Sequence, residues 1–164
     1  MSGLIKIPCV MMRGGTSRGP YFRAEDLPAD IAERDRVLLS VMGSGHHLQI
    51  DGIGGGNPVT SKVAIVSKSS HPEADVDYLF AQVNIHEDIV DTAPNCGNML
   101  VGIAPFAIEQ GLVPAKDGRT TVRIYNVNTD SLITSVVETP GGEVNYEGNI
   151  KIDGVPGSAA PVQV

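Results

Sequence analysis

Residues 98–110 read NMLVGIAPFAIEQ, and this run predicts a helix that is apolar on all of its faces. A helix on the surface of a protein shows a polar side, and this one does not. The rest of the chain must therefore enclose it. Gly111 follows the run and marks its end.

The segments around this run predict strands and one further helix. The expected strands are 4–12, 21–22, 63–66, 77–85 (an element that 89–91 closes), 120–128, 131–138 and a closing pair at 143–146 and 149–152. An amphipathic helix is expected to start at 26–28 and to stop at Gly43. About eight strands and two helices in mixed order predict an α+β fold. In this fold a curved, mixed or antiparallel, barrel-like β-sheet wraps around the central apolar helix.

Composition agrees with a packed core. Of 164 residues, 41% are hydrophobic and 19% are charged, which excludes a disordered chain. Aromatic residues make up only 4% and Trp is absent, so the core must be mainly aliphatic. The 19 Gly and 11 Pro indicate many turns and short elements rather than a helical bundle.

Charge and cysteine content limit the partners and the compartment. A net charge of −7 without a Lys/Arg cluster argues against nucleic acid or an anionic membrane as partner. No stretch approaches the roughly 18 apolar residues of a membrane span, and residues 1–6 do not resemble a signal peptide. The two cysteines show no metal or redox spacing, so we expect a cytoplasmic protein with free thiols. Cys9, in an apolar strand, is expected in the core.

The helix is preceded by NCGN at residues 95–98, which makes Cys96 the strongest candidate for chemistry. Asn95 or Asn98 can cap the helix, and Gly97 keeps bulk away. A thiol at a helix N-terminus lies near unpaired N–H groups, which favour the thiolate and can receive a carboxylate. The alternative is a buried structural cysteine, but the polar residues on both sides favour chemistry.

Residues 13–19, RGGTSRG, have the composition of an anion site. Amides come from Gly14 and Gly15, hydroxyls from Thr16 and Ser17, and positive charge from Arg13 and Arg18. The segment lacks the Gly-Lys-Ser/Thr ending of a P-loop. A plain turn between strands explains the same residues equally well.

A second glycine-rich loop covers residues 52–56 and contains Gly54 and Gly55. A strand follows it rather than a helix, so it suits a carboxylate or keto group better than a dinucleotide. Lys62 lies just beyond and would be a general base if burial favoured its neutral form; its residue pattern alone favours a solvated lysine. His46 and His47 lack partners at ligand spacing, so no metal site is expected.

Four motifs, in order along essentially the whole chain, resemble the methylaconitate cis–trans isomerase family. They are IPCVMMRGGTSRG (7–19), QIDGIGG (49–55), TSKVA (60–64) and NCGN (95–98). The resemblance implies a diaminopimelate-epimerase-like fold of two lobes, each a curved sheet around a central helix, with the active site between the lobes. It also implies that residues 1–164 are a single N-terminal lobe, since family members are roughly twice as long.

The implied activity is a cofactor-independent isomerase or tautomerase. It would shift a proton on an unsaturated tri- or dicarboxylic acid such as 4-oxalomesaconate. The resemblance implies Cys96 and Lys62 as the acid/base pair. Substrate carboxylates would be held by Arg13, Gly14, Gly15, Thr16, Ser17, Gly54, Gly55, Ser61, Asn95, Gly97 and Asn98.

Two other functions stay open at this level. A lobe without its second half would be a non-catalytic anion-binding or assembly module, pairing with a C-terminal lobe or with copies of itself. An amino-acid racemase on the same fold would need a thiol on each side of the cleft, and this chain offers one credible thiol.

Overall fold

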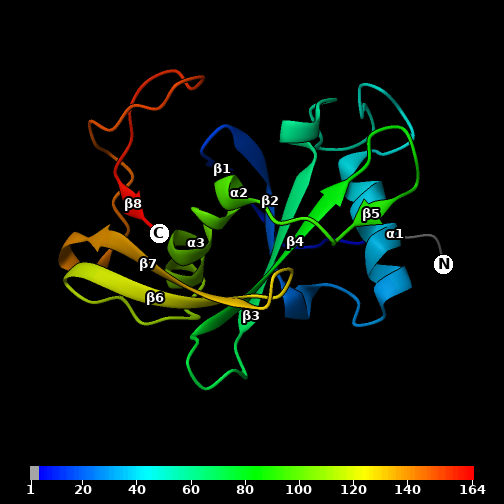
Figure 1. Ribbon diagram of the computed structural model, residues 1–164. Helices are drawn as coiled ribbons and strands as arrows, with labels where there is room; N and C mark the ends of the chain where they lie inside the picture. The colour runs from blue at the N-terminus through cyan, green and yellow to red at the C-terminus, as the bar shows by residue number, and fades with distance from the viewer. Residues whose placement is uncertain (1–3) are drawn as a thin grey trace.

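The computed structural model describes residues 4–164, and its centre is one mixed sheet with helices against both faces (Figure 1). The sheet order is β1-β2-β3-β4-β6-β7-β8, and β5 pairs with β4. The strands are β1 (Val10–Gly14), β2 (Ser17–Arg23), β3 (Lys62–Lys68), β4 (Val76–Val83), β5 (Val90–Asp91), β6 (Gly118–Asn126), β7 (Ser131–Thr139) and β8 (Val162–Gln163). The helices are α1 (Ile31–Met42), α2 (Gly97–Leu100) and α3 (Ile103–Glu109), with 3₁₀ turns at Ala24–Asp26, Pro58–Thr60 and Pro140–Gly142.

Two parallel pairs place the helices. β2 runs parallel to β3 and β4 runs parallel to β6, whereas the other neighbours are antiparallel. A parallel pair needs a crossover connection, and α1 supplies the first while α2 and α3 supply the second. Val63 packs in the cluster with α1 and Ala64 packs in the cluster with α3. Because successive strand residues point to opposite faces, the two helix layers lie on opposite sides of the sheet.

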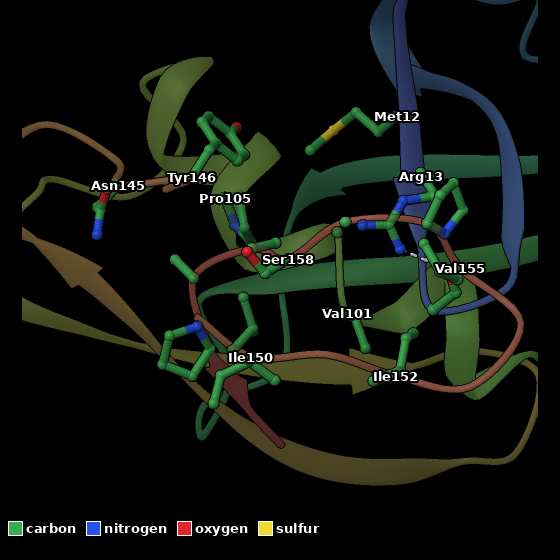
Figure 2. Close-up of a pocket in the computed structure, with 18 residues that line it drawn as sticks. Met12, Arg13, Val101, Pro105, Asn145, Tyr146, Ile150, Ile152, Val155 and Ser158 are labelled. Atoms are coloured by element: carbon green, nitrogen blue, oxygen red, sulfur yellow. Dashed lines mark hydrogen bonds between the residues drawn. The ribbon is translucent and has the colours of Figure 1, made fainter. Parts of the chain in front are cut away.

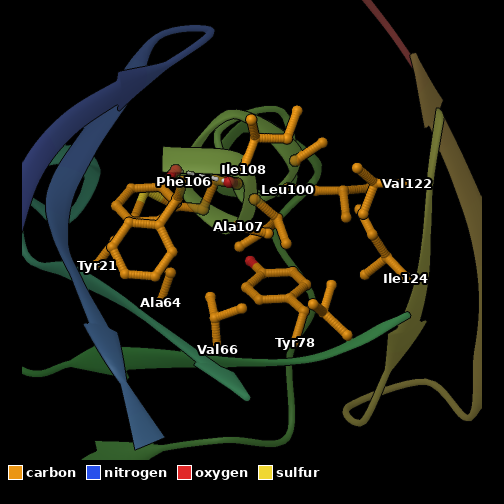
Figure 3. Packing of buried hydrophobic residues seen from close by; sticks show 14 of the residues in the cluster. Tyr21, Ala64, Val66, Tyr78, Leu100, Phe106, Ala107, Ile108, Val122 and Ile124 are labelled. Carbon is orange, nitrogen blue, oxygen red and sulfur yellow. Dashed lines mark hydrogen bonds between the residues drawn. The ribbon is translucent and has the colours of Figure 1, made fainter. Parts of the chain in front are cut away.

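The central helix is enclosed as expected. In α3 every residue from Ile103 to Ile108 is buried. Figure 3 shows this helix end-on, with side chains from β2, β3, β4 and β6 around it, among them Tyr21, Val66 and Ile124. The α+β class and the curved sheet around an apolar helix are confirmed.

The predicted helix 98–110 is wrong in one respect, because it is broken into α2 and α3 at Val101 and Gly102. Pro105 explains the break. It has no N–H to donate to the carbonyl of Val101, and its ring clashes with that carbonyl in a continuous helix. The N–H of Gly102 bonds instead to the carbonyl of Met99 at 3.2 Å, which is a tighter turn.

Local signals set the ends of α1. Gly43 ends the helix, as predicted, in the left-handed conformation with φ 75°. The start lies later than the predicted 26–28, because the side chain of Asp30 accepts the N–H of Glu33 at 2.9 Å and caps the helix there.

The predicted strand 4–12 is too long, since strand pairing begins only at Val10. Cys9 precedes that pairing and is exposed, so its expected place in the core is wrong.

The predicted closing pair, 143–146 with 149–152, does not form. β8 pairs with β7 at Val136 and Val137, and Ile150 makes a single bridge with Ala159. Gly154 and Gly157 have φ values of 82° and 81°, a left-handed conformation that turns the chain back on itself. Residues 150–159 therefore fold onto each other instead of pairing with 143–146.

Candidate active site

The N-terminus of α2 brings a thiol and an amine together. Cys96 is the N-cap residue of α2 and is 7% exposed. Lys62 begins β3 on the face that carries Ala64, toward α2, and its Nζ lies 3.4 Å from the Sγ of Cys96. The same Nζ lies 5.1 Å from the centre of the Phe80 ring, a cation–π contact. The amine is therefore held between the thiol and an aromatic face.

Two asparagine side chains form a hydrogen-bonded chain that ends on the backbone of Cys96. The Oδ1 of Asn95 accepts the backbone N–H of Cys96 at 2.7 Å and the Nδ2 of Asn126 at 2.8 Å. Asn126 is fully buried at the end of β6. Sequence reasoning missed Asn126, because it lies within the predicted strand 120–128 and belongs to none of the motifs.

Two buried tyrosines donate to the backbone of α2. The hydroxyl of Tyr21 donates to the carbonyl of Met99 at 2.6 Å, and that of Tyr78 donates to the carbonyl of Cys96 at 3.2 Å. Burial, and then the nearby Cys96, raise the pKa of both tyrosines well above the usual range, so both hydroxyls stay protonated and can donate. Neither tyrosine had a signal in the sequence beyond its apolar strand.

The turn between β1 and β2 docks against α2. The Nδ2 of Asn98 donates to the hydroxyls of Thr16 at 3.0 Å and Ser17 at 3.2 Å. A Cβ on Gly14 would lie 1.9 Å from the carbonyl oxygen of Asn98, and one on Gly15 would lie 2.2 Å from its Oδ1. Only glycine permits this approach. The segment 13–19 is thus the end of a β-hairpin with its turn at Gly15 and Thr16, and it also contacts the helix that Cys96 caps.

The two arginines of this hairpin lie elsewhere. Arg13 and Arg18 are directly opposite in register, and they leave the hairpin from the face opposite to Ser17. The Nη1 of Arg13 donates to the carbonyl of Gly15 at 2.7 Å. Arg13 also lines a cavity of about 330 Å³ between the hairpin, α3 and the C-terminal segment (Figure 2). Within residues 4–164 neither arginine forms an ion pair, so this edge carries uncompensated positive charge.

The second glycine loop is built around Gln49. This buried side chain donates from Nε2 to the hydroxyl of Ser61 at 2.7 Å and accepts the N–H of Gly56 at 2.9 Å. The Ser61 hydroxyl in turn donates to the carbonyl of Val83 at 2.8 Å. A Cβ on Gly54 would lie 2.1 Å from the Oε1 of Gln49, whereas one on Gly55 would lie 2.4 Å from the Oγ1 of Thr60 and 2.8 Å from the Nη2 of Arg18.

The predicted site residues thus fall into separate groups. Around Cys96 and Lys62 the structure gathers Asn95, Gly97, Asn98, Gly14, Gly15, Thr16 and Ser17. Across the described chain, no hydrogen bond joins Gly54, Gly55, Ser61 or Arg13 to Cys96. Ser61 directly precedes Lys62 in the chain, and Gly54 lies against the Gln49 side chain that bonds to Ser61.

Two further properties concern the described residues as a whole. Within 4–164 there is no group of three or more His, Cys, Asp or Glu side chains placed to hold a metal ion. Nor does this part of the chain contain a helix with the length and apolarity needed to cross a bilayer.

The fold is that of an isomerase of known structure. The crystal structure of a methylitaconate-delta-isomerase matches it with a TM-score of 0.94 and 49% identity, over 96% of this chain and 70% of that one. Residues 4–164 match the family model described as PrpF protein. The chain belongs to the PrpF family, which confirms the resemblance drawn from the four sequence motifs.

Its curated relatives are longer proteins. YbhH of Escherichia coli (strain K12), which is named as an isomerase, is 66% identical to this chain over 157 residues. These residues are 96% of this chain and 45% of YbhH. The 4-oxalomesaconate tautomerase of Pseudomonas putida is 55% identical over 162 residues, 99% of this chain and 45% of the relative. The chain thus spans under half the length of these relatives.

Proposed function

We propose that this chain forms one side of an isomerase active site that shifts a proton on an unsaturated di- or tricarboxylic acid. The candidate substrates are those of its relatives: 4-oxalomesaconate, 3-methylitaconate and 2-methylaconitate. The single observation that carries the proposal is the 3.4 Å separation of Lys62 Nζ and Cys96 Sγ at the N-terminus of α2.

The proposed proton shift uses these two groups as its base and its acid. The Cys96 thiolate takes a proton from a carbon next to a carbonyl or vinyl carboxylate, and the C–H electrons enter the conjugated system as an enolate. The Lys62 ammonium gives a proton to a different carbon, and the double bond moves. Transfer from the new thiol to the new amine restores the pair. No electrons are lost or gained, so no redox cofactor is part of the proposal.

Charge around the site supports an anionic substrate. Lys62 forms no salt bridge with a carboxylate within the described chain, although the protein carries a net charge of −7. The hydroxyls and amides of the β1–β2 turn lie beside Asn98 and can hold a carboxylate. A complete site requires a facing wall, which we assign to a second lobe or to a second copy of this chain. We further propose that the protein acts in the cytoplasm, in keeping with its free cysteines.

The test is deuterium exchange. Each of the three acids is incubated in D₂O with the 164-residue chain, and with a fusion in which the remainder of the Pseudomonas putida relative follows Val164. Mass spectrometry then follows deuterium at carbon. We expect exchange and isomerisation of at least one acid by the fusion. Both should fall about 10²–10⁴-fold in Cys96→Ala and in Lys62→Met.

Controls separate loss of chemistry from loss of fold. Cys9→Ala removes the exposed thiol and should leave the exchange rate unchanged. An exchange rate that survives Cys96→Ala, or a folded fusion that exchanges none of the three acids, would overturn the proposal. Binding of an acid without exchange would favour an anion-binding module.

A further inference from the structure

Tyr78 contacts the candidate nucleophile through the backbone. It lies on β4, is fully buried, and donates its hydroxyl to the carbonyl of Cys96 at 3.2 Å. The same carbonyl accepts the N–H of Leu100 at 3.1 Å, which is the first hydrogen bond of α2. Tyr78 therefore joins the start of α2 to the centre of the sheet.

α2 cannot hold its own N-terminus in place. The helix has four residues, and no side chain caps its first turn. A single turn fixes many dihedral angles for few hydrogen bonds, so tertiary contacts must position it. Within the described chain, two side chains bond to the backbone of Cys96: Tyr78 to the carbonyl, which is a tertiary contact, and the neighbouring Asn95 to the N–H. Of these, only Tyr78 comes from a strand in the middle of the sheet.

β4 also supports Lys62. Phe80 lies two residues beyond Tyr78 on the same face of β4, and its ring centre is 5.1 Å from the Nζ of Lys62. The antiparallel register pairs Lys62 with Gln82 and Val66 with Tyr78, which fixes β4 against β3. β4 thus carries one aromatic residue that contacts the backbone of Cys96 and a second that contacts the amine of Lys62.

We infer that Tyr78 is a positioning residue that keeps the Sγ of Cys96 within hydrogen-bond distance of the Nζ of Lys62. It acts through the carbonyl of Cys96, and within the described chain its hydroxyl forms no hydrogen bond with the Sγ of Cys96 or the Nζ of Lys62. The inference rests on the proposed role of the Lys62–Cys96 pair, but its test needs no substrate. A chain without isomerase activity and a Tyr78→Phe variant without an effect on the reactivity of Cys96 can therefore be told apart.

The experiment measures thiolate formation at Cys96. In a Cys9→Ser background, the rate of alkylation by iodoacetamide is followed by intact mass between pH 5 and 9. Lys62→Met should move the midpoint of this pH profile upward by about one pH unit or more, because a neighbouring positive charge is lost. Tyr78→Phe keeps the ring and should lower the rate at pH 7 about threefold by a smaller upward shift.

The decisive comparison is the double variant. If Tyr78 acts through the thiol–amine distance, Tyr78→Phe should have no effect on the midpoint once Lys62 is Met. General loosening of the site would change how accessible the thiol is, and therefore the plateau rate of alkylation at high pH. It would not make the effect of Tyr78→Phe on the midpoint depend on whether Lys62 is present. An equal shift in both backgrounds, or no shift in either, would refute the inference.

Tyr21→Phe is the matched control. It removes an equally buried hydroxyl from the other end of α2, at the carbonyl of Met99, and should leave the midpoint unchanged. A shift as large as that of Tyr78→Phe would contradict a specific role for Tyr78. Circular dichroism checks the fold of each variant, and Tyr78→Met, which also lacks the donor, replaces Tyr78→Phe if that variant does not fold.

Discussion

The Nδ2 of Asn126 lies 2.8 Å from the Oδ1 of Asn95, and this oxygen also accepts the backbone N–H of Cys96. The end of β6 is thus connected to the start of α2 through one asparagine side chain. The Oδ1 of Asn126 accepts the N–H of Asn128 at 3.0 Å, so both ends of this buried amide are used.

Replacing Asn126 by Ala should destabilise the protein by about 1–3 kcal/mol, because the buried Asn126 amide loses its hydrogen bonds to the Oδ1 of Asn95 and the N–H of Asn128. Urea unfolding followed by circular dichroism measures the change as a lower midpoint with an unchanged slope. Asn149→Ala, at an exposed asparagine, should stay within about 0.5 kcal/mol of the parent. Equal midpoints for the two variants would show that the Asn126 bonds contribute nothing to stability.

Gly19→Ala should be destabilising by about 1–3 kcal/mol through overpacking. A Cβ at this position would lie 1.8 Å from the backbone carbonyl of Lys62, so β2 and β3 must separate. Gly97→Ala is the control, since nothing lies within 4 Å of its added Cβ and alanine favours the helix. Thermal unfolding distinguishes the two, and a Gly19→Ala variant as stable as Gly97→Ala would contradict the close approach of these strands.

Phe106→Ala should cost about 3–5 kcal/mol, because it opens a cavity between α3 and the sheet. Phe106 is 1% exposed and packs 5.8 Å from Tyr21, measured between ring centres. Ile31→Ala, at a position on α1 that is 64% exposed, should change the free energy of unfolding by less than about 0.5 kcal/mol. Chemical denaturation measures the free energy of unfolding of both variants. Similar decreases for the two variants would contradict the burial of Phe106 between α3 and the sheet.

The carboxylate of Asp75 accepts hydrogen bonds from the side chain and backbone of Arg123, and these bonds lower the pKa of Asp75. The contribution to stability is present above the unfolded pKa of about 3.9 and is lost as the pH falls through the lower folded value. The stability of Asp75→Asn should therefore fall less steeply than that of the parent below pH 4. Thermal unfolding from pH 5 to pH 2 measures this, and parallel curves would exclude the effect.

Local patterns predicted the elements whose signals lie within a few residues. α1 ends where Gly43 can adopt a left-handed conformation, and the apolar run 98–110 correctly indicated an enclosed helix. The break at Val101 and Gly102 also has a local cause in Pro105, but the uniform apolarity of the run concealed it.

Features set by distant residues could not be predicted in this way. Residues 143–152 have the pattern of strands, yet their pairing depends on turns at Gly154 and Gly157 and on the edge that β7 offers to β8. The residue pattern favoured a solvated Lys62, and only the family resemblance paired it with Cys96. Tyr78 and Asn126 contact the site because of strand register, which no short motif reveals.

The crossover that carries α3 from β4 to β6 has a consequence for synthesis of the chain. The ribosome makes Ile103 to Ile108 before β6 and β7, whose residues Val122, Ile124 and Val137 belong to the same core cluster. A nascent chain that ends at Gly111 therefore exposes the most apolar helix of the protein on one side. We expect the nascent chain to be aggregation-prone until Thr139 has left the exit tunnel, and this interval is a window in which co-translational chaperones can bind it.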